Sequence, residues 1–344
     1  MLLKFNPEYF GLDISKNFWR FVACKKIGGK IVLTSFNEIN VPEGVATDDQ
    51  IIKTKEGVEI MKKLVNKAIG KKNKTPYISV CLPESKTFIK LITIPNNPTN
   101  LNEAIVEEAK KHIPYPLEKT YLDFQITDPT EKNKVLIGVV PKEIVANFEN
   151  FLNQAGFSPL VLEIEAMAIA RAVLPLKTTL QEPIMVIDLG ASRSGLFVAE
   201  KNHIAFNLSL NVSGEDITNA LMKGLQLDKQ AAEQLKINNG LISSENTSGG
   251  QILKPLMEKF NSEILAALEF YKTHFSAEHK ITKLLLTGSG ANLKGLPEFI
   301  SAGTGLNTEI AKPDLNIVQT KVKIPPEKLL SYTTAIGLAL RQFN

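Results

Sequence analysis

The two halves of the chain begin alike, and this repeat limits the possible folds more than any other feature. Near the start, an apolar strand ends at Asp13 and leads to Phe21-Val22-Ala23. Near the middle, a similar strand ends at Asp188 and leads to Phe197-Val198-Ala199. Each copy reads as a strand ending in aspartate, a short polar turn, a second strand, a tight turn and a third strand. Copies 175 residues apart predict two related lobes that face each other.

The polar turn after each aspartate predicts a phosphate site. Tight turns between strands expose backbone N–H groups, which donate hydrogen bonds to phosphate oxygens. A carboxylate beside the turn, Asp13 or Asp188, can hold Mg²⁺ directly or through water. One such turn is equally consistent with a hairpin and a capping aspartate, whereas two equivalent copies favour a polyphosphate held between the lobes. The glycine-rich turn at residues 287–290 would let an adenine or ribose approach the backbone closely.

Composition and charge exclude several other classes of protein. The 344 residues are 44% hydrophobic and 22% charged, which is typical of a globular chain of about two to three domains. A net charge of +4, spread over this length, indicates no nucleic-acid binding. Cys24 and Cys81 are too far apart in sequence to indicate a metal cluster or a disulfide framework, so we expect a reducing, cytoplasmic location.

Other local patterns are weak or negative. No run of about 18 apolar residues predicts a transmembrane helix, and the N-terminus lacks the features of a signal peptide. The four histidines are scattered, and no P-loop, nucleophile elbow or H-E-x-x-H motif occurs. The basic run Lys71-Lys72-Asn73-Lys74 is typical of a solvated loop.

Periodicity and turn residues predict a mixed α/β chain. We expect strands at residues 9–13, 18–24, 30–36, 77–82, 86–94, 121–127, 135–140, 160–164, 184–188, 196–200, 203–208 and 281–286. We expect helices at residues 48–70, 100–113, 142–155, 165–174, after 214, at 255–275 and at 332–341, and a polar loop at 238–250. Asn100 and Glu103 have the spacing of a capping box, and Gly70 is a helix stop signal.

Motifs spread over the chain point to one known superfamily. Residues 111–125 read KHIPYPLEKTYLDFQ, and further motifs lie at residues 162–172, 232–236, 285–291 and 335–341. Together they resemble the actin-like ATPase superfamily and, within it, the PilM family of type IV pilus assembly proteins, which is related to FtsA. The first motif is similar to a signature of that family. The others resemble its connecting helix, its nucleoside-facing A-E-x-x-K, its adenosine motif and its closing helix.

The resemblance covers Tyr9 to Arg341 and implies an actin-like (ribonuclease-H-like), two-lobed α/β fold with an FtsA-type inserted subdomain in the first lobe. The first lobe would have a core at 7–85, completed by 142–182 and 325–344, and the inserted peptide-binding subdomain at 86–141. The second lobe would have a core at 183–215, completed by 265–324, and an outer subdomain at 216–264.

The resemblance also implies a site for ATP and Mg²⁺. The first phosphate loop would contain Asp13, Ser15 and Lys16, and the second Asp188, Gly190, Ala191 and Ser192. Asp13 and Asp188 would be the metal ligands. The residues around the ribose and adenine would be Gly214, Glu215, Glu233, Lys236, Gly288, Ser289, Gly290 and Asn292.

The catalytic candidates are Glu165 and Asp188. Glu165 stands where relatives often keep a polar residue that orients water, although a glutamate that opens a helix is equally a favourable first-turn charge. Serine replaces the family's usual glycine at positions 15, 213 and 289, and each added Cβ narrows the approach of the backbone to phosphate or base. We therefore expect binding with slow hydrolysis at most.

The function implied is that of a cytoplasmic adaptor. It would bind the cytoplasmic N-terminal tail of a PilN-like inner-membrane protein, and so lie at the inner membrane through its partner. Other pilus assembly components are further candidate partners, whereas nucleic acid and direct membrane insertion are not expected. Phe88, Tyr115 and Phe124 are candidates for the partner groove, with a role in the buried core as the alternative for each.

Other functions share the same scaffold. An active ATPase or a sugar kinase is the main alternative, but we find neither a dedicated base nor a sugar pocket. An FtsA-like filament protein would carry an amphipathic C-terminal tail, and the sequence ends three residues beyond the closing helix. A GspL-like secretion protein would carry a transmembrane helix further on.

Overall fold

The computed structural model describes residues 7–83, 86–126, 133–201, 203–241, 248–275 and 280–343. The chain divides into a first unit, Met1–Lys177 with Pro313–Asn344, and a second unit, Thr178–Lys312. Residues 178–182 and 313–324 therefore fall in the opposite unit from the one that we expected. Residues 313–324 join the first unit because the Val318 N–H donates to the Ile31 carbonyl at 2.7 Å, and the Val318 carbonyl accepts from the Leu33 N–H at 3.0 Å.

A six-stranded sheet forms the base of the first unit. Its strands are β1 (Phe10–Ile14), β2 (Phe18–Ile27), β3 (Lys30–Asn40), β4 (Ile69–Gly70), β5 (Tyr77–Leu82) and β9 (Ser158–Ile164). Their order is β4-β3-β2-β1-β5-β9, antiparallel from β4 to β1 and parallel from β1 to β9. Because the carboxyl ends of parallel strands meet at one edge, the residues that follow β1, β5 and β9 lie at the same end of the sheet.

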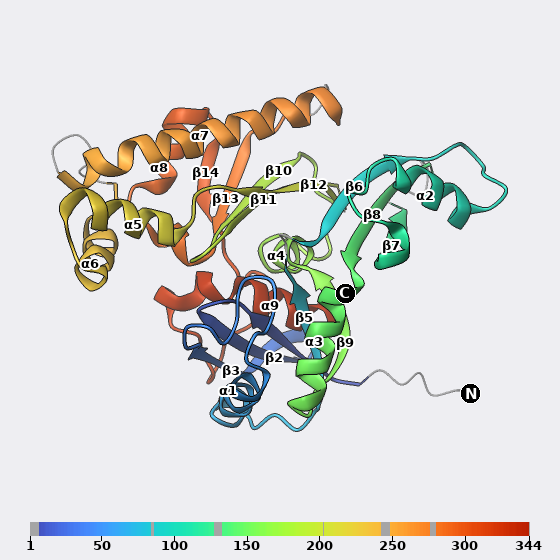
Figure 1. Cartoon of the computed structure of the whole chain (residues 1–344), viewed down its shortest axis with the longest axis horizontal. Coiled ribbons are helices and arrows are strands. Elements are labelled where there is room, and N and C mark those ends of the chain that lie inside the picture. Colours follow the sequence, from blue (N-terminus) through green and yellow to red (C-terminus); the bar gives the residue numbers. More distant parts are fainter. Residues whose placement is uncertain are drawn as a thin grey trace. The chain divides into compact units, whose positions relative to one another are not determined.

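Helices cover both faces of this sheet. On one face, α1 (Thr54–Asn66) and α3 (Lys142–Gln154) enclose an apolar core in which Trp19 packs edge-on against Phe151. On the other face lie α4 (Glu165–Val173) and α9 (Thr333–Leu340), where Ala168 and Leu338 pack against Cys81. In Figure 1, α1 lies below the strands of this sheet and α9 lies above them.

Helix α9 approaches its neighbours at positions that have no side chain. A Cβ on Gly337 would overlap the Ala168 carbonyl oxygen of α4, and a Cβ on Gly11 of β1 would overlap the Ala335 carbonyl oxygen of α9. Backbones pack this closely only at glycine. The contact explains why α9 is buried along its whole length.

A smaller three-stranded sheet lies in residues 86–141 of the first unit. Its strands β6 (Phe88–Thr93), β8 (Lys134–Pro141) and β7 (Thr120–Ile126) pair antiparallel in that order. The helix α2 (Leu101–Lys110) covers one face and buries Ile105 and Ala109 there. The Asn100 side chain caps α2 by accepting from the N–H groups of Asn102 and Glu103. A short 3-10 turn, Leu117–Lys119, leads into β7.

The second unit repeats the strand order of the first. Its strands are β10 (Ile184–Leu189), β11 (Ser194–Glu200), β12 (His203–Leu210), β13 (Lys283–Thr287) and β14 (Asn307–Ile310). The order β14-β13-β10-β11-β12 matches β9-β5-β1-β2-β3, with the same parallel and antiparallel pairs. The repeat predicted from the sequence is confirmed.

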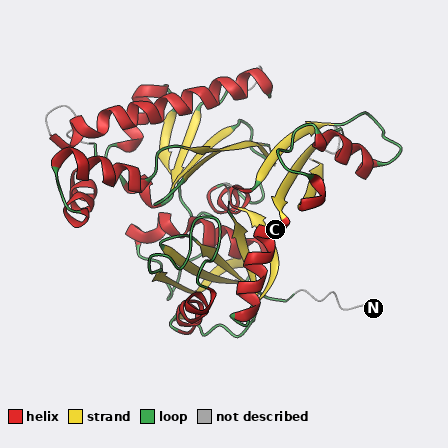
Figure 2. Ribbon diagram, in the orientation of Figure 1, coloured by secondary structure: helices red, strands yellow, loops and turns green. Residues whose placement is uncertain are grey.

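The α-helices in the described part of the second unit are α5 (Gly214–Leu225), α6 (Lys229–Asn239), α7 (Ser248–His274) and α8 (Leu296–Thr304). Figure 2 shows α7 as the long helix beside the strands of this unit. Its buried stripe includes Met257, Phe260, Ile264 and Tyr271, as the spacing predicts. Among the described residues, a 3-10 turn of the second unit lies at Ser289–Asn292, and further 3-10 turns of the first unit lie at Pro326–Tyr332 and Arg341–Phe343. None of the helices that the structure describes combines the length and apolar character of a membrane span.

Several predicted elements differ from the structure. The helix expected at 48–70 is only α1, because the Ile51 N–H donates to the Asn147 side chain at 2.9 Å and holds the preceding residues in a bridged loop. Gly70 does not end that helix but pairs with Ser35 in β4. Of the loop expected at 238–250, residues 242–247 lie outside the described residues, and 248–250 already belong to α7. Elements α6, α8 and β14 were missed.

The glycine contact of α9 predicts a large effect of one methyl group. We expect Gly337→Ala to lower the free energy of unfolding by more than about 3 kcal/mol, because the Cβ has no room beside the Ala168 backbone. Gly249→Ala is the control, since its Cβ would meet only ordinary contacts, and should change stability by no more than about 1 kcal/mol. Chemical denaturation of both variants measures the difference, and equal stabilities would contradict the packing described.

The two buried cysteines predict a pH dependence. Burial raises the pKa of the Cys24 thiol to about 12, and burial together with nearby carboxylates raises the pKa of Cys81. The unfolded thiol ionises first, so the free energy of unfolding falls as pH rises above about 9. In the native protein both thiols should resist alkylation at pH 8, and both should react in denaturant. Rapid native labelling of either cysteine would contradict its burial.

Candidate functional site

The end of β10 carries the aspartate of the second repeat within a set of close backbone contacts. Asp188 pairs with Gly195 on one side and with Thr287 of β13 on the other. Gly288 follows with a φ of 83°, and a Cβ there would lie 2.7 Å from Asp188 Oδ1 and 2.5 Å from the Leu189 carbonyl. Asp188 and Gly288, which the sequence places 100 residues apart, therefore lie together.

The turn after β10 is joined to the N-terminus of α5. The Gly214 N–H donates to the Gly190 carbonyl at 2.9 Å, and the Glu215 N–H donates to the Ala191 carbonyl at 2.7 Å. Ser213, expected to crowd the site in place of glycine, is instead the N-cap of α5 in a capping box with Asp216. Its extended backbone has a φ of −125°, which any residue adopts. Serine here stabilises the helix that carries Gly214.

A polar cluster in α5 and α6 lies beside Gly214. Lys236 Nζ donates to the Gly214 carbonyl at 3.2 Å, to Thr218 Oγ1 at 2.8 Å and to Glu233 Oε1 at 2.9 Å. Thr218 Oγ1 also donates to Glu233 Oε1 at 2.5 Å. Sequence reasoning identified Gly214, Glu233 and Lys236 but missed Thr218, although it follows Gly214 by four residues on the same helix and so shares its face.

The remaining candidates of the second unit lie around this centre. Ser192 is half-buried in the turn after β10. Ser289 and Asn292 are exposed at the ends of the 3-10 turn after β13, and the Asn292 side chain donates to the Ser289 carbonyl at 3.2 Å. A Cβ on Gly290 would lie 2.6 Å from Leu189 Cγ, so this glycine packs against the end of β10.

The first unit holds its own candidates at the carboxyl ends of β1 and β9. Asp13 is 7% exposed and faces Arg20 across the β1–β2 pair, with Arg20 Nη1 3.6 Å from Asp13 Oδ2. Arg20 binds Glu38 more closely, at 2.7 Å. In the turn that follows β1, the Ser15 N–H and hydroxyl both donate to the Phe18 carbonyl, and Lys16 is half-buried.

Glu165 opens α4 and is 8% exposed. Its Oε1 accepts from the Thr334 hydroxyl of α9 at 3.2 Å. Both Asp13 and Glu165 raise the pKa of Cys81, behind the larger effect of burial, which places the two carboxylates near the same thiol. Within the described ranges, no group of three or more His, Cys, Asp or Glu is arranged to hold a metal.

The first unit also contains a pocket of about 630 Å³ against the three-stranded sheet. Gly138 of β8 lies at the centre of this wall, paired with Ile89 of β6 on one side and Asp123 of β7 on the other. A Cβ at Gly138 would meet only the tip of Ile164, at 3.3 Å. The pocket therefore exists partly because this position has no side chain. Neighbouring rows of the same wall are Leu136 with Gln125, and Val140 with Tyr121.

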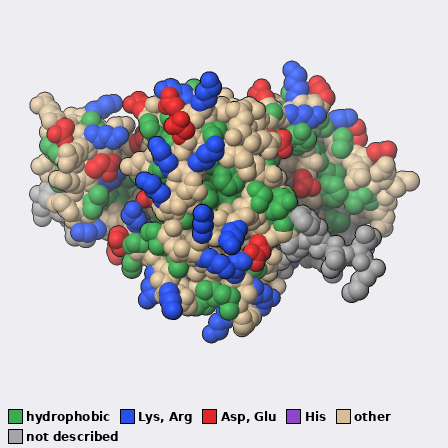
Figure 3. Space-filling model, turned by 90° about the horizontal axis from the view of Figure 1, so that it is seen from below, with side chains coloured by type: hydrophobic (Ala, Val, Ile, Leu, Met, Phe, Trp, Pro, Cys, Tyr) green, Lys and Arg blue, Asp and Glu red, His purple; other side chains and the backbone are tan. Residues whose placement is uncertain are grey.

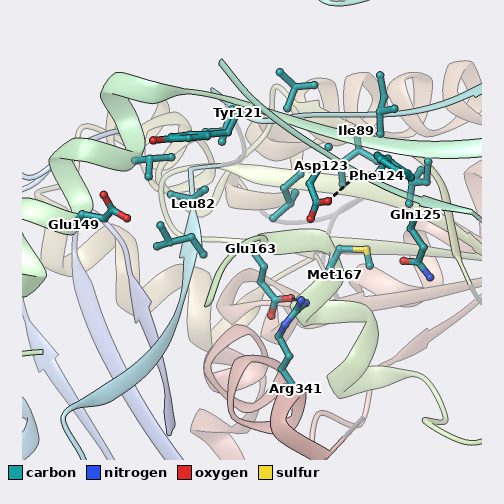
Figure 4. Close-up of a pocket in the computed structure, with 18 residues that line it drawn as sticks. Leu82, Ile89, Tyr121, Asp123, Phe124, Gln125, Glu149, Glu163, Met167 and Arg341 are labelled. Carbon is teal, nitrogen blue, oxygen red and sulfur yellow. Dashed lines mark hydrogen bonds and ion pairs between the residues drawn. The ribbon is translucent and has the colours of Figure 1, made fainter. Parts of the chain in front are cut away.

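The facing wall comes from the large sheet and its helices. Figure 4 shows Tyr121 and Asp123 on one side of the pocket, and Leu82, Met167, Glu163 and Arg341 on the other. Most lining side chains are apolar, and Tyr121 is 53% exposed. Such a concave, mainly apolar surface with a few polar groups is typical of a binding site.

The charged groups of the pocket differ in their partners. Glu163 is 6% exposed, accepts from Arg171 Nη1 at 2.8 Å and Nη2 at 2.9 Å, and accepts from Arg341 Nη1 at 2.6 Å. Arg341 is 42% exposed at its side chain, so its other N–H donors can reach a ligand. Asp123 and Glu149 have no cationic partner among the described residues. The pocket therefore has two carboxylates without a cationic partner in the described part of the chain, and one accessible guanidinium.

The three residues expected for the partner groove lie differently with respect to this pocket. Phe124 lines the pocket, but it also packs with Phe88 against the core beneath α2. Tyr115 is half-buried and does not line the pocket. The alternation in β7 separates Leu122 and Phe124, which face the core, from Tyr121, Asp123 and Gln125. This period of two was the signal available for the residues of β7 that line the pocket.

Comparison with known proteins identifies one family. The model of the family described as "Type IV pilus assembly protein PilM" matches residues 11–343. Cell division protein FtsA of Neisseria meningitidis serogroup B (strain ATCC BAA-335 / MC58) is 23% identical over an alignment of 215 residues that covers 56% of this chain and 50% of the relative. The chain thus spans about half the length of that relative.

Solved structures share the fold at low sequence identity. A "PilM-PilN type IV pilus biogenesis complex" is 24% identical with a TM-score of 0.83, over 98% of this chain and 99% of that one. MreB5 of Spiroplasma citri bound to ADP is 12% identical with a TM-score of 0.55, over 96% and 94% of the two chains. These similarities, with the repeated sheet, show a mixed α/β, two-lobed actin-like fold.

The contacts at Gly288 predict how the site responds to a side chain. Gly288→Ala should lower the free energy of unfolding of the second unit by at least about 2 kcal/mol more than Gly305→Ala does. Gly305 is the matched control because it has a similar φ of 76° but no neighbour within 4 Å of its Cβ position, so it measures backbone strain alone. Denaturation by urea gives both values. Equal losses would contradict the close contact with Asp188.

Proposed function

The chain belongs to the PilM family of type IV pilus assembly proteins, and we propose that it is an ATP-binding adaptor that captures the N-terminal tail of a PilN-like membrane protein. The observation that carries this proposal is the pocket of the first unit. It combines mainly apolar lining, a glycine at the centre of one wall, and two carboxylates, Asp123 and Glu149, that have no cationic partner among the described residues.

The pocket suits an extended peptide better than a compact small molecule. It lies between β7 and β9, which are the outermost strands of their sheets within the first unit. The outer edge of such a strand can pair with an added strand, which provides backbone hydrogen bonds. Side chains that alternate along the peptide would then enter the apolar pocket beside Gly138. Main-chain pairing would supply affinity, and the pocket would supply specificity.

The charges favour a particular kind of peptide. Asp123 and Glu149 line the pocket without a cationic partner in the described part of the chain, so a lysine or arginine beside the apolar residues would complement them. The accessible N–H donors of Arg341 suit a peptide carbonyl or a side-chain amide oxygen. We therefore propose a partner segment with large aliphatic residues and at least one basic residue.

Nucleotide binding is the second part of the proposal. Gly190 and Gly288 let the backbone pack closely around Asp188, since a Cβ would overlap the Arg193 or Leu189 carbonyl oxygen. Tight turns of this kind can present backbone N–H groups to a phosphate. In the second unit, Gly214, Thr218, Glu233 and Lys236 would contact the nucleoside. In the first unit, Asp13, Ser15 and Lys16 are the proposed residues of a phosphate loop. Asp13 and Asp188 remain the proposed ligands of the Mg²⁺ that accompanies ATP, and this metal would supply neutralisation of phosphate charge. For any turnover, Glu165 is the proposed water-orienting residue, with Asp188.

The peptide proposal predicts the effect of filling the pocket. We expect the full chain to bind the N-terminal peptide of its own organism's PilN-like protein, and Gly138→Leu to weaken binding at least about tenfold, or about 1.4 kcal/mol. Thr93→Leu adds the same side chain to the same sheet outside the pocket and should bind normally. Calorimetric titration measures both, with and without ATP·Mg²⁺.

Each result of this titration decides one part of the proposal. Normal binding by Gly138→Leu would exclude this pocket as the site. If the unchanged chain bound no peptide with or without nucleotide, the adaptor function would be wrong. Titration with ATP·Mg²⁺ alone tests the nucleotide part, because Gly288→Ala should bind it more weakly than Gly305→Ala.

A further inference from the structure

Three segments of the first unit bring eight exposed lysines to one surface, which we call the lysine face. Its members are Lys26, Lys30, Lys67, Lys71, Lys72, Lys74, Lys321 and Lys323. They come from residues 26–32, 67–74 and 318–324, which contain no aspartate or glutamate. The loop at 71–74, which by itself is typical of a solvated connection, supplies three of the eight lysines.

Backbone contacts hold the three segments together along β3. The Val318 N–H donates to the Ile31 carbonyl at 2.7 Å, and the Lys71 N–H donates to the Thr34 carbonyl at 2.9 Å. A Cβ at Gly70 would lie 2.9 Å from a methyl group of Val322, which places the segments at 67–74 and 318–324 side by side. The lysine face therefore has a fixed scaffold.

The lysine face carries more positive charge than the net charge of the whole chain indicates. Its eight lysines carry +8, whereas the complete chain carries +4, so the remaining residues carry a net −4. None of the eight has an acidic partner among the described residues, although Lys25 nearby pairs with Glu8. The small net charge gave no indication of nucleic-acid binding, and it does not show that the fold collects basic residues on one surface. Figure 3 shows basic side chains gathered on the underside of the molecule, with few acidic ones among them.

Exposed aliphatic side chains lie among these lysines. Ile27 is 57% exposed at the β2–β3 turn, Ile69 is 56% exposed in β4, and Val318 is 37% exposed beside β3. The three segments contain no arginine and no aromatic residue. Nucleic-acid surfaces typically use arginine and aromatic stacking, whereas lysine around aliphatic side chains matches phosphate headgroups above hydrocarbon.

We propose that the lysine face binds the surface of an anionic phospholipid membrane. The lysines would lie among the headgroup phosphates, since four to eight clustered basic residues suffice for such attraction. Ile27, Ile69 and Val318 would enter the boundary between headgroups and acyl chains. This contact goes beyond the proposed capture of a membrane-anchored partner and does not require it. Where both contacts form, the two attachments reinforce each other because the second becomes intramolecular.

The test is co-sedimentation of the full chain with vesicles of phosphatidylcholine alone or mixed with phosphatidylglycerol. We expect binding only to the anionic vesicles, weakened by salt. Replacing Lys30, Lys71, Lys72 and Lys323 with glutamate should reduce it at least about tenfold. The matched control replaces Lys223, Lys229, Lys254 and Lys259, exposed lysines of the second unit, and should bind as the unchanged chain does. Thermal unfolding checks that both variants fold.

Two further variants separate the possible results. Ile27→Ser with Ile69→Ser should weaken vesicle binding even at high salt, because it removes the aliphatic contact. Gly138→Leu, which tests the peptide pocket, should bind vesicles normally, so the two proposals can fail independently. Equal loss in both lysine variants, or no binding to anionic vesicles, would overturn the lipid proposal. So would binding to an oligonucleotide that matches vesicle binding and does not depend on Ile27 and Ile69.

Discussion

The close packing of α9 is the contact on which the first unit depends. This helix lies against β1 at Gly11 and against α4 at Gly337, and neither interface has room for a methyl group. Ion pairs and a hydrogen bond hold its C-terminal end in place. Glu163 binds both Arg171 and Arg341, and Arg171 also donates to the Gly337 carbonyl of α9 at 2.8 Å. The residue that follows, Gln342, exchanges hydrogen bonds with the Tyr9 backbone. Residues at the two ends of the first unit are therefore hydrogen-bonded to each other beside β1.

The sequence predicted most of this architecture because it is recorded in local periodicity. The sequences of β1 to β3 and of β10 to β12 share one pattern: an apolar run, a polar turn, a second apolar run and a second turn that contains glycine or lysine. The repeat is therefore visible in the sequence alone. The helix at 48–70 was too long because Ile51 fits an amphipathic stripe, yet its N–H binds Asn147, which is 96 residues away. A contact of that range leaves no local signal, and tertiary packing decided the boundary.

Binding surfaces were harder to predict, for the same reason. The candidates around Asp188 and Lys236 could be named because each lies in a recognisable motif, and the structure brings the second-unit residues together at Gly214. The pocket has no such motif. Gly138 contributes by leaving space where a side chain would otherwise lie, and Arg341 is about 200 residues further along the sequence, so no local pattern contains both. The lysine face is also a product of folding. Its three segments are separated by up to nearly the length of the chain, and only the pairing along β3 unites them.

Helix α9 also connects the two candidate sites of the first unit. Thr334, near its start, donates to Glu165, and Arg341, just after its end, donates to Glu163 at the floor of the pocket. A helix of eight residues is about 12 Å long and moves as one body. Under the proposed function, a peptide that engages Arg341 would act at one end of the helix whose other end contacts Glu165, and Glu165 lies only two residues beyond Glu163. If ligands at the two sites favour different positions of α9, each changes the affinity of the other by the same factor, because coupling between binding sites is reciprocal.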